Sequence, residues 1–275
     1  MTDFGTRLTQ AWEQRGRLCV GIDPHAALLS GWGLGDDVAG LERFAMTTVE
    51  AVAPVAGVVK PQSAFFERFG SRGVAVLERV VAESRAAGAL VVLDAKRGDI
   101  GSTSQAYADA YLDPSSPLAS DALTASPYLG FGSLDPMVEA CDAHGAGLFV
   151  LVLTSNKEGP EVQHARNGDR TVAGTMLAHL SRLNAGATPL GSFGAVVGAT
   201  IGGTTESLDI NGPLLVPGYG AQGGTLADLK RIFGPAASRC VPSSSRGVLQ
   251  AGPDVTALRD AVRRENDALA DLADA

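Results

Sequence analysis

The feature that most constrains the fold is a regular alternation of short apolar runs with amphipathic segments along the 275-residue chain. The apolar runs are rich in Val, Leu and Ala and have the length of buried parallel strands. Between them, apolar residues recur at helical spacing. Eight strands are predicted, at residues 18–22, 55–59, 89–92, 122–124, 147–153, 193–198, 213–216 and 238–241.

A closed barrel is the fold that this alternation favours. Helices are predicted at residues 4–15, 39–53, 72–87, 101–112, 171–183 and 253–272, with two more that end near 143 and begin near 225. Eight strand–helix units fit a closed (β/α)8 barrel better than an open doubly wound sheet. Since no linker interrupts the pattern, we expect residues 1–275 to form a single (β/α)8 TIM-barrel domain with a short N-terminal helix. Residues 160–170 are polar and are expected to be a loop.

Net charge and cysteine content narrow the class of protein. The formal net charge is −8 at pH 7, which argues against a nucleic-acid duplex or an anionic membrane as partner, because both need a basic face. The three cysteines are widely spaced and include no Cys-x-x-Cys pair, so neither a disulfide framework nor a zinc site is indicated. The chain shows no apolar signal segment and no apolar run long enough to span a membrane. We therefore expect a soluble, cytoplasmic protein.

Polar residues gather at the predicted carboxyl ends of the strands. In a (β/α)8 barrel these ends meet at one rim, where active sites form. Each residue has a simpler explanation by itself, such as a turn at an Asp-Pro step or a lysine that reaches solvent. Their shared position on one rim favours a functional site. The set is Asp23, Lys60, Asp94, Lys96, Ser126, Ser155, Gln222 and Arg246.

The third strand runs into Asp94-Ala95-Lys96-Arg97-Gly98-Asp99. Side chains alternate along a strand, so Asp94 and Lys96 are expected on the same side. An isolated Asp-x-Lys is as consistent with a structural ion pair as with a functional one. Only four of the 22 basic residues are lysines, however, and both Lys60 and Lys96 stand at strand ends. Because lysine can release a proton and arginine cannot, these positions indicate proton chemistry.

A glycine-rich loop follows the seventh predicted strand. Residues 217–224 read Pro-Gly-Tyr-Gly-Ala-Gln-Gly-Gly and precede a helix predicted to begin near Thr225. Glycines let backbone N–H groups approach an anion, a helix N-terminus favours negative charge, and barrels often bind phosphate between the loops after strands seven and eight. Arg246, which follows the eighth strand, has the guanidinium fork that pairs with phosphate. A glycine-rich turn without a ligand is the alternative interpretation.

These motifs, in this order, resemble the orotidine 5′-monophosphate decarboxylase family, in the subgroup usually called type 2. The family signature is similar to Asp94-x-Lys96-x-x-Asp99. The likeness spans nearly the whole chain, with further matches at residues 21–24, 60–67, 126–130, 154–156, 217–224 and 246. The signature alone also fits related phosphosugar decarboxylases.

The resemblance implies a reaction and its catalytic residues. It implies cofactor-independent decarboxylation of orotidine 5′-monophosphate (OMP) to uridine 5′-monophosphate (UMP), the last step of de novo UMP synthesis, with no metal. Lys96 is expected to protonate C6 of the pyrimidine as CO2 leaves, and Asp94 to lie beside the departing carboxylate. Lys60, Asp94, Lys96 and Asp99 are expected to form an alternating array of charges.

Binding roles follow from the same resemblance. Asp23 and Lys60 are expected to hold the ribose hydroxyls, Ser155 the pyrimidine amide edge, and Gln222, Ser245 and Arg246 the 5′-phosphate. The resemblance also implies a homodimer in which Asp99 and Thr103 complete the partner's site.

The chain departs from the family pattern at two positions. Ser245 stands where some relatives have glycine, so only its backbone N–H is expected to bind phosphate. Ser126 stands where many relatives have asparagine, and it is assigned no role.

Two other functions stay open at this point. A metal-dependent phosphosugar decarboxylase of the same barrel superfamily would lose its activity on chelation. A non-catalytic phosphometabolite-binding barrel would bind uridine nucleotides without turnover. A Schiff-base lysine is disfavoured, because neighbouring carboxylates raise the pKa of a lysine instead of freeing its lone pair.

Overall fold

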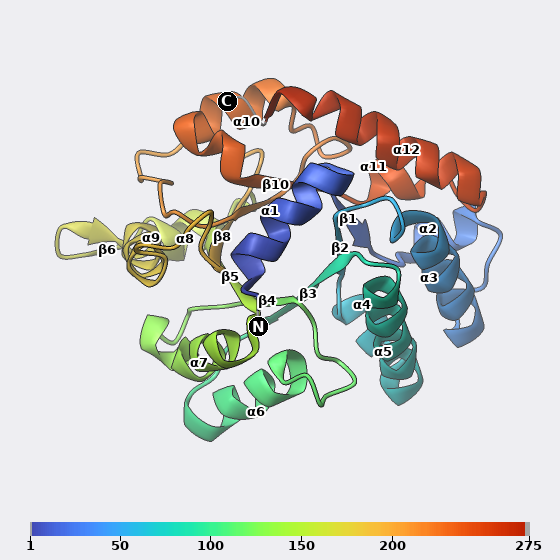
Figure 1. The fold of residues 1–275 in the computed structure, drawn as a ribbon, viewed down its shortest axis with the longest axis horizontal. Helices are drawn as coiled ribbons and strands as arrows, with labels where there is room; N and C mark the ends of the chain where they lie inside the picture. Colours follow the sequence, from blue (N-terminus) through green and yellow to red (C-terminus); the bar gives the residue numbers. More distant parts are fainter. Residues whose placement is uncertain (1, 273–275) are drawn as a thin grey trace.

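The computed structural model describes residues 2–272, which contain a closed barrel of parallel strands (Figure 1). Residues 1 and 273–275, which the predicted domain 1–275 includes, lie outside the described residues. The barrel strands are β1 (Cys19–Ile22), β2 (Val58–Pro61), β3 (Leu90–Arg97), β4 (Ala122–Ala125), β5 (Gly147–Leu153), β8 (Phe193–Val197), β9 (Leu214–Pro217) and β10 (Cys240–Ser244). Around the barrel the order is β1-β10-β9-β8-β5-β4-β3-β2, and β2 pairs with β1 to close it. The predicted (β/α)8 barrel is confirmed.

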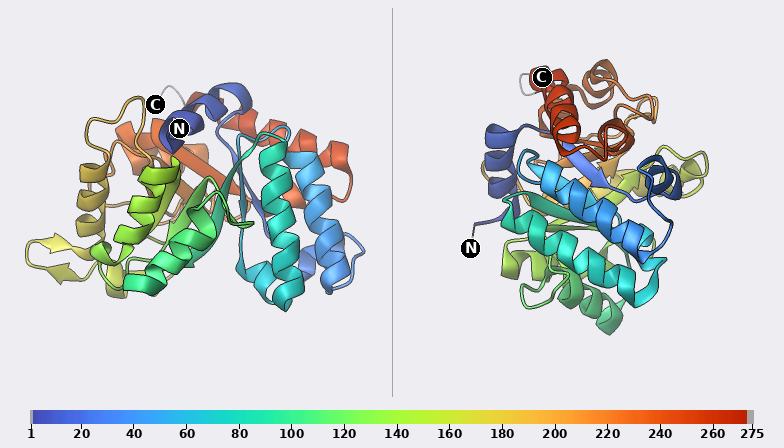
Figure 2. Two further views of the ribbon diagram at one scale, coloured as in Figure 1. Left: turned by 60° about the horizontal axis from the view of Figure 1, so that its bottom comes forward. Right: turned by 90° about the vertical axis from the view of Figure 1, so that its right-hand side faces the viewer.

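Helices surround the barrel, and Figure 2 shows them on its outer face. The longer ones are α3 (Val38–Val52), α5 (Gly70–Ala86), α6 (Gly101–Leu112), α7 (Asp135–His144), α9 (Val172–Leu183), α10 (Leu226–Phe233) and α12 (Val255–Ala268). Their apolar faces pack on the outward-facing strand residues and form the larger of two apolar cores. Within residues 2–272, no helix combines the length and the apolar character that a membrane crossing requires.

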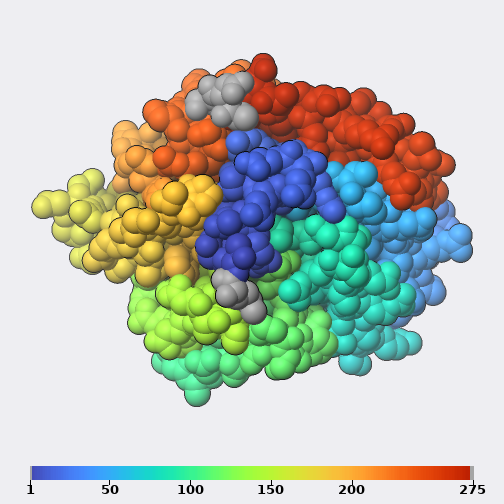
Figure 3. All heavy atoms as spheres, viewed as in Figure 1, coloured from blue at the N-terminus to red at the C-terminus, as the bar shows by residue number. Residues whose placement is uncertain are grey.

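Helix α1 (Phe4–Arg15) closes the barrel at the amino-terminal ends of its strands, and it lies across the centre of the face in Figure 3. Asp3 caps the helix by accepting a hydrogen bond from Thr6 N–H. Phe4 enters the barrel and meets the Phe149 ring edge to face, with 5.9 Å between ring centres. Gly147 leaves room for it, since a Cβ there would lie 2.4 Å from the Phe4 ring. The barrel therefore opens toward solvent only at the other rim.

The predicted loop at 160–170 contains regular structure. Helix α8 (Gly159–Gln163) is followed by an antiparallel hairpin of β6 (Arg166–Asn167) and β7 (Arg170–Thr171). Gly168 makes the turn with φ of 63°, a conformation that glycine adopts without strain. The hairpin was missed because its strands are too short and too polar to show an alternation.

The alternation of strands and helices is not complete. Residues 198–213, all of them described, join β8 to β9 without a helix. None of the predicted helices falls there, so the expected count of eight strand–helix units is wrong and seven are present within residues 2–272. Short helices appear elsewhere, below the length at which periodicity is visible. They are α2 (Ala26–Gly31), α4 (Ala64–Glu67), α11 (Arg246–Leu249), and the 3-10 turns η1 (Phe131–Leu134), η2 (Gly234–Arg239) and η3 (Ala270–Leu272).

Candidate active site

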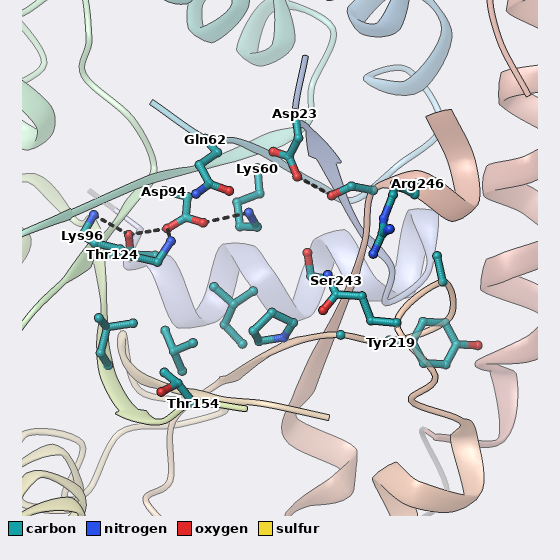
Figure 4. Close-up of a pocket in the computed structure, with 18 of the residues that line it drawn as sticks. Asp23, Lys60, Gln62, Asp94, Lys96, Thr124, Thr154, Tyr219, Ser243 and Arg246 are labelled. Atoms are coloured by element: carbon teal, nitrogen blue, oxygen red, sulfur yellow. Dashed lines mark hydrogen bonds and ion pairs between the residues drawn. The ribbon is translucent and has the colours of Figure 1, made fainter. Parts of the chain in front are cut away.

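A cavity of about 200 Å³ opens at the carboxyl ends of the barrel strands (Figure 4). Seven of the residues predicted from the sequence line it: Asp23, Lys60, Asp94, Lys96, Gln222, Ser245 and Arg246. The cavity also has an apolar floor formed by Leu151, Val196 and Leu215. The carboxyl ends of several strands thus meet at one cavity, and the roles of these residues stay predictions.

Asp94 lies between two lysines and forms an ion pair with each. Its Oδ2 is 2.9 Å from Nζ of Lys60, and its Oδ1 is 2.6 Å from Nζ of Lys96. The Lys60 and Asp94 side chains are 6% and 8% exposed, whereas that of Lys96 is 42% exposed. Lys96 thus carries the more exposed ammonium, whereas Lys60 lines the cavity from a nearly buried position.

The pKa values of the buried pair keep both groups charged. Burial by itself would raise the pKa of Asp94, but the charges of Lys60 and Lys96 outweigh it and hold that pKa well below its usual value. Burial by itself would lower the pKa of Lys60, but the charges of Asp94 and Asp23 outweigh it and raise the pKa. The cavity wall therefore presents fixed alternating charges at neutral pH.

Thr124, on β4, links the backbone of Lys96 to the carboxylate of Asp94. Its hydroxyl donates to Asp94 Oδ1 at 2.9 Å and accepts from the Lys96 N–H at 2.9 Å. The side chain is 1% exposed. Because the Thr124 hydroxyl makes both hydrogen bonds at once, it fixes the Asp94 carboxylate relative to the backbone of Lys96.

Lys96 has a left-handed backbone, with φ of 47°. This conformation is unfavourable for a residue with a Cβ and costs on the order of 1–3 kcal/mol. The pairing of β3 with β4 shifts register between Leu93 and Arg97, where the strand bulges. The strand therefore departs from regular geometry at the residue that presents the ammonium.

Asp23 follows β1 and faces the cavity with one satisfied and one free oxygen. Ser245 Oγ donates to Asp23 Oδ2 at 2.6 Å. Asp23 Oδ1 is buried and has no hydrogen-bond partner among the described residues. A buried acceptor without a partner is unfavourable unless a ligand or water fills the position. Asp23, which lines the cavity, thus keeps one acceptor that no other described residue uses.

Gln222 and Arg246 stand at the end of the cavity away from Lys96. Both side chains are exposed at its rim, and neither forms a hydrogen bond or ion pair with another described residue. Gly218 and Tyr219 border the same end, as Figure 4 shows for Tyr219 and Arg246. The hydrogen-bond donors of Gln222 and Arg246 are therefore available to an anion at the end of the cavity away from the ion pairs of Asp94.

The helix after the glycine-rich loop does not contribute as expected. Thr225 and Asp228 cap the N-terminus of α10 reciprocally. Thr225 borders a separate hollow beside α12, together with Glu265. The expectation that the α10 N-terminus faces this cavity is not met, because Thr225 does not line it; the N–H groups of Thr225 and Asp228 are used within the cap.

Ser126 of the strand-end set and three residues with predicted roles do not line the cavity. Asp99 is half-buried, and its Oδ1 accepts a hydrogen bond from the Ile100 N–H at 2.7 Å. Thr103 is exposed on α6, and Ser155 is exposed after β5. In this single chain the array of charges therefore consists of Lys60, Asp94 and Lys96; the fourth member, Asp99, was expected from the partner subunit.

Other polar residues reach the cavity without having been predicted. They are His25, Gln62, Thr124, Thr154, Tyr219 and Ser243. Gln62 and Thr154 directly follow strands, so the rule that marked Lys60 and Ser155 could have found them. Thr124 lies inside a buried strand, where nothing in the sequence separates it from an ordinary strand threonine. In residues 2–272, no group of three or more His, Cys, Asp or Glu side chains is arranged to hold a metal ion.

Known proteins resemble this chain over nearly its whole length. The family model described as orotidine 5′-phosphate decarboxylase / HUMPS family matches residues 16–261. An orotidine 5′-phosphate decarboxylase of Nocardioides sp. is 73% identical over 274 residues, which cover 98% of this chain and 99% of the relative. That of Streptomyces coelicolor is 67% identical over 266 residues, 96% of each chain.

Solved structures of such decarboxylases have the same fold. A crystal structure from Streptomyces avermitilis superposes with a TM-score of 0.98 at 65% identity, over 100% of this chain and 97% of that one. The OMP decarboxylase of Leishmania donovani superposes with a TM-score of 0.75 at 30% identity, over 100% of both chains. The chain belongs to the orotidine 5′-phosphate decarboxylase / HUMPS family.

Proposed function

We propose that this chain decarboxylates OMP to UMP and CO2, with Lys96 as the proton donor. The observation that carries the proposal is the Lys60–Asp94–Lys96 series of ion pairs at the wall of the cavity. Both lysines line the cavity, and Lys96, at the outer end of the series, is the more exposed of the two. The family relationship points to the same reaction.

The charges match the demands of this reaction. When the bond between C6 and the carboxylate breaks, its electron pair stays on C6, where the ring offers no electron sink. A fixed ammonium next to that carbon stabilises the developing negative charge and then donates its proton. Asp94 keeps Lys96 charged and oriented. Its own negative charge, beside the carboxylate of OMP, would repel that group as it departs. The amine left on Lys96 regains its proton from water after the product leaves.

Asp23 and Lys60 are proposed to hold the ribose. Asp23 Oδ1 has no partner among the described residues and would accept from a ribose hydroxyl. Ser245 keeps the other Asp23 oxygen in place through the 2.6 Å hydrogen bond. The Ser245 side chain thus has a task that its position in the sequence did not indicate, in addition to any contact of its N–H with phosphate.

Gln222 and Arg246 are proposed to bind the 5′-phosphate, because both are exposed donors at the cavity end away from Lys96. Binding energy from a phosphate so far from C6 can drive closure of residues 217–224 over the substrate. Ser155, exposed in this structure, would reach the pyrimidine through closure of its own loop, residues 155–159, driven by the same binding energy.

A homodimer is proposed to complete the site. Asp99 and Thr103 lie outside the cavity of their own chain, on the rim between β3 and α6. On the same rim, Ile100 follows β3, and Tyr128 and Leu129 follow β4; they are 62%, 76% and 53% exposed. Large apolar side chains gathered at one rim are typical of an interaction surface. A second copy docked there would cover them and bring Asp99 and Thr103 to the neighbouring cavity.

The reaction is tested by following OMP consumption with the purified protein, with and without EDTA. Equal turnover in both conditions is the expected result. Loss of turnover with EDTA would instead favour a metal-dependent phosphosugar decarboxylase. Tight UMP binding without any turnover would favour a non-catalytic binding barrel.

A further inference from the structure

The backbone from Asp94 to Arg97 is bridged at both ends by the segment around helix α4. At one end, the Ser63 N–H donates to the Asp94 carbonyl at 3.2 Å. At the other end, the Arg97 guanidinium forms an ion pair with the Glu67 carboxylate. The Ser63 hydroxyl donates to the same Glu67 oxygen. Glu67 therefore ties together the two ends of a short stretch that contains the left-handed Lys96.

Arg97 is held by more than this ion pair. Its Nε donates to the Tyr111 hydroxyl at 3.3 Å, and its guanidinium lies 5.6 Å from the centre of the Tyr107 ring. Its carbonyl accepts a hydrogen bond from the Ser126 N–H at 2.8 Å. The Arg97 side chain is 27% exposed, so its charge is shielded from solvent more than that of an ordinary surface residue. Three separate segments thus fix the residue that follows Lys96.

We propose that Glu67 and Arg97 are positioning residues that hold the strained Lys96 turn and so aim its ammonium into the cavity; this inference rests on the proposed function. A left-handed backbone at a residue with a Cβ persists only where its surroundings impose it. Thr124 imposes it on the N–H side of Lys96. The Glu67–Arg97 pair imposes it on the carbonyl side.

Neither Glu67 nor Arg97 lines the cavity, so their effect on the reaction passes through Lys96. When the pair is broken, the turn can relax toward an extended backbone, and Nζ moves away from its place beside the reacting carbon. A shift of about 1 Å in a reacting group can lower a rate about 100-fold. Binding of the nucleotide depends on other residues and is expected to change little.

The first test replaces Glu67→Gln, which keeps the shape of the side chain and removes its charge. The expected result is a kcat for OMP lowered about 10- to 100-fold, with KM and the affinity for UMP within about threefold of wild type. Glu42→Gln is the matched control. It breaks the Arg79–Glu42 ion pair between α5 and α3, whose side chains are 51% and 45% exposed, and is expected to leave kcat and KM unchanged.

The second test compares two replacements of Arg97. Arg97→Lys keeps a cation within reach of Glu67 and is expected to retain more of kcat than Arg97→Met. The double variant Glu67→Gln/Arg97→Met is expected to be no slower than the slower single variant, because both changes break one interaction.

Wild-type kcat in folded Glu67→Gln and Arg97→Met proteins would overturn the proposal. Equal losses of kcat and UMP affinity, or loss of the circular dichroism of the fold, would also overturn it, since the pair would then have a general structural role. If the wild-type protein consumes no OMP, the proposed function fails instead, so the two failures are distinguishable.

Discussion

Lys60 Nζ and Asp94 Oδ2 lie 2.9 Å apart, and both side chains are less than a tenth exposed. Such a pair is expensive to bury and is stable only while both charges persist. Asp94 has the additional partner Lys96, whereas Lys60 has Asp23 as its second nearby acid. The stability of the barrel rim therefore depends on the charges of the site, which leads to the first prediction.

Replacement Lys60→Met is expected to destabilise the protein by about 3–5 kcal/mol, because it removes a partner of a buried carboxylate. The free energy of unfolding in urea at pH 7 measures this. The surface variant Glu42→Gln, which loses an ion pair half exposed to solvent, is expected to change it by less than about 1 kcal/mol. Equal effects of the two variants would contradict the prediction.

Stability is expected to fall at both extremes of pH. The folded-state pKa of Asp94 is depressed from the usual 3.8, so its contribution is present above that value and is lost as pH falls through the folded pKa. The pKa of Lys60 is raised from the usual 10.5, so its contribution is present below 10.5 and is lost as pH rises through the higher folded value. In thermal unfolding measured over a range of pH, the Tm of Asp94→Asn should fall less steeply on acidification than the Tm of the wild type.

Replacement Lys96→Ala is expected to lower kcat for OMP at least 1000-fold, since it removes both the proton donor and the cation that stabilises the carbanion. The dissociation constant for UMP, measured by calorimetry, is expected to change by less than about tenfold, because phosphate and ribose contacts persist. Substantial turnover by this variant would exclude Lys96 as the proton donor.

Replacement Thr124→Val removes the hydroxyl that joins the Lys96 N–H to Asp94 and leaves both groups short of a partner. We expect kcat to fall about 10- to 100-fold, in line with a misplaced ammonium. Thr124→Ser keeps the hydroxyl and serves as the control, with kcat close to wild type. Steady-state kinetics measure kcat for both variants. Equal kcat values for Thr124→Val and Thr124→Ser would contradict the role of the hydroxyl.

Gly21 is expected to tolerate no side chain while Ser245 is present. A Cβ on Gly21 would lie 1.9 Å from Ser245 Oγ, so Gly21→Ala would displace the hydroxyl from Asp23 and raise KM for OMP about tenfold. The double variant Gly21→Ala/Ser245→Gly removes the obstacle and is expected to recover part of the affinity. A double variant weaker than the single one would show that the clash lies elsewhere.

Shared active sites are tested by mixing inactive variants. Lys96→Ala and Asp99→Ala homodimers are each expected to be inactive. After subunit exchange, one site of each mixed dimer combines the intact Lys96 of one chain with the intact Asp99 of the other, and activity should return to about a quarter of wild type, by counting intact sites in a random mixture of subunits. Exchange followed by fluorescent labels, without recovery of activity, would exclude a site built from two chains.

Much of the fold follows from local patterns. The helices at 4–15 and 101–112 and the strand at 147–153 have the predicted bounds, because apolar periodicity and short strand-like runs are encoded within a few residues. The expected count of eight strand–helix units fails at residues 198–213, where no helix was predicted and none forms, because barrel closure requires that strands pair and leaves their connections free. The strand-end rule located Asp23, Lys60, Asp94, Lys96 and Arg246 because all parallel strands end at one rim.

The sequence by itself determined the barrel and the charged residues that reach its open rim. Only the tertiary structure decided how those residues act on one another. It placed Thr124 between Asp94 and the backbone of Lys96, and it turned Lys96 into a left-handed conformation. It also kept Asp99 and Thr103 out of their own chain's cavity. These relationships depend on the register between neighbouring strands, which is set when the barrel closes and which no local pattern of residues encodes.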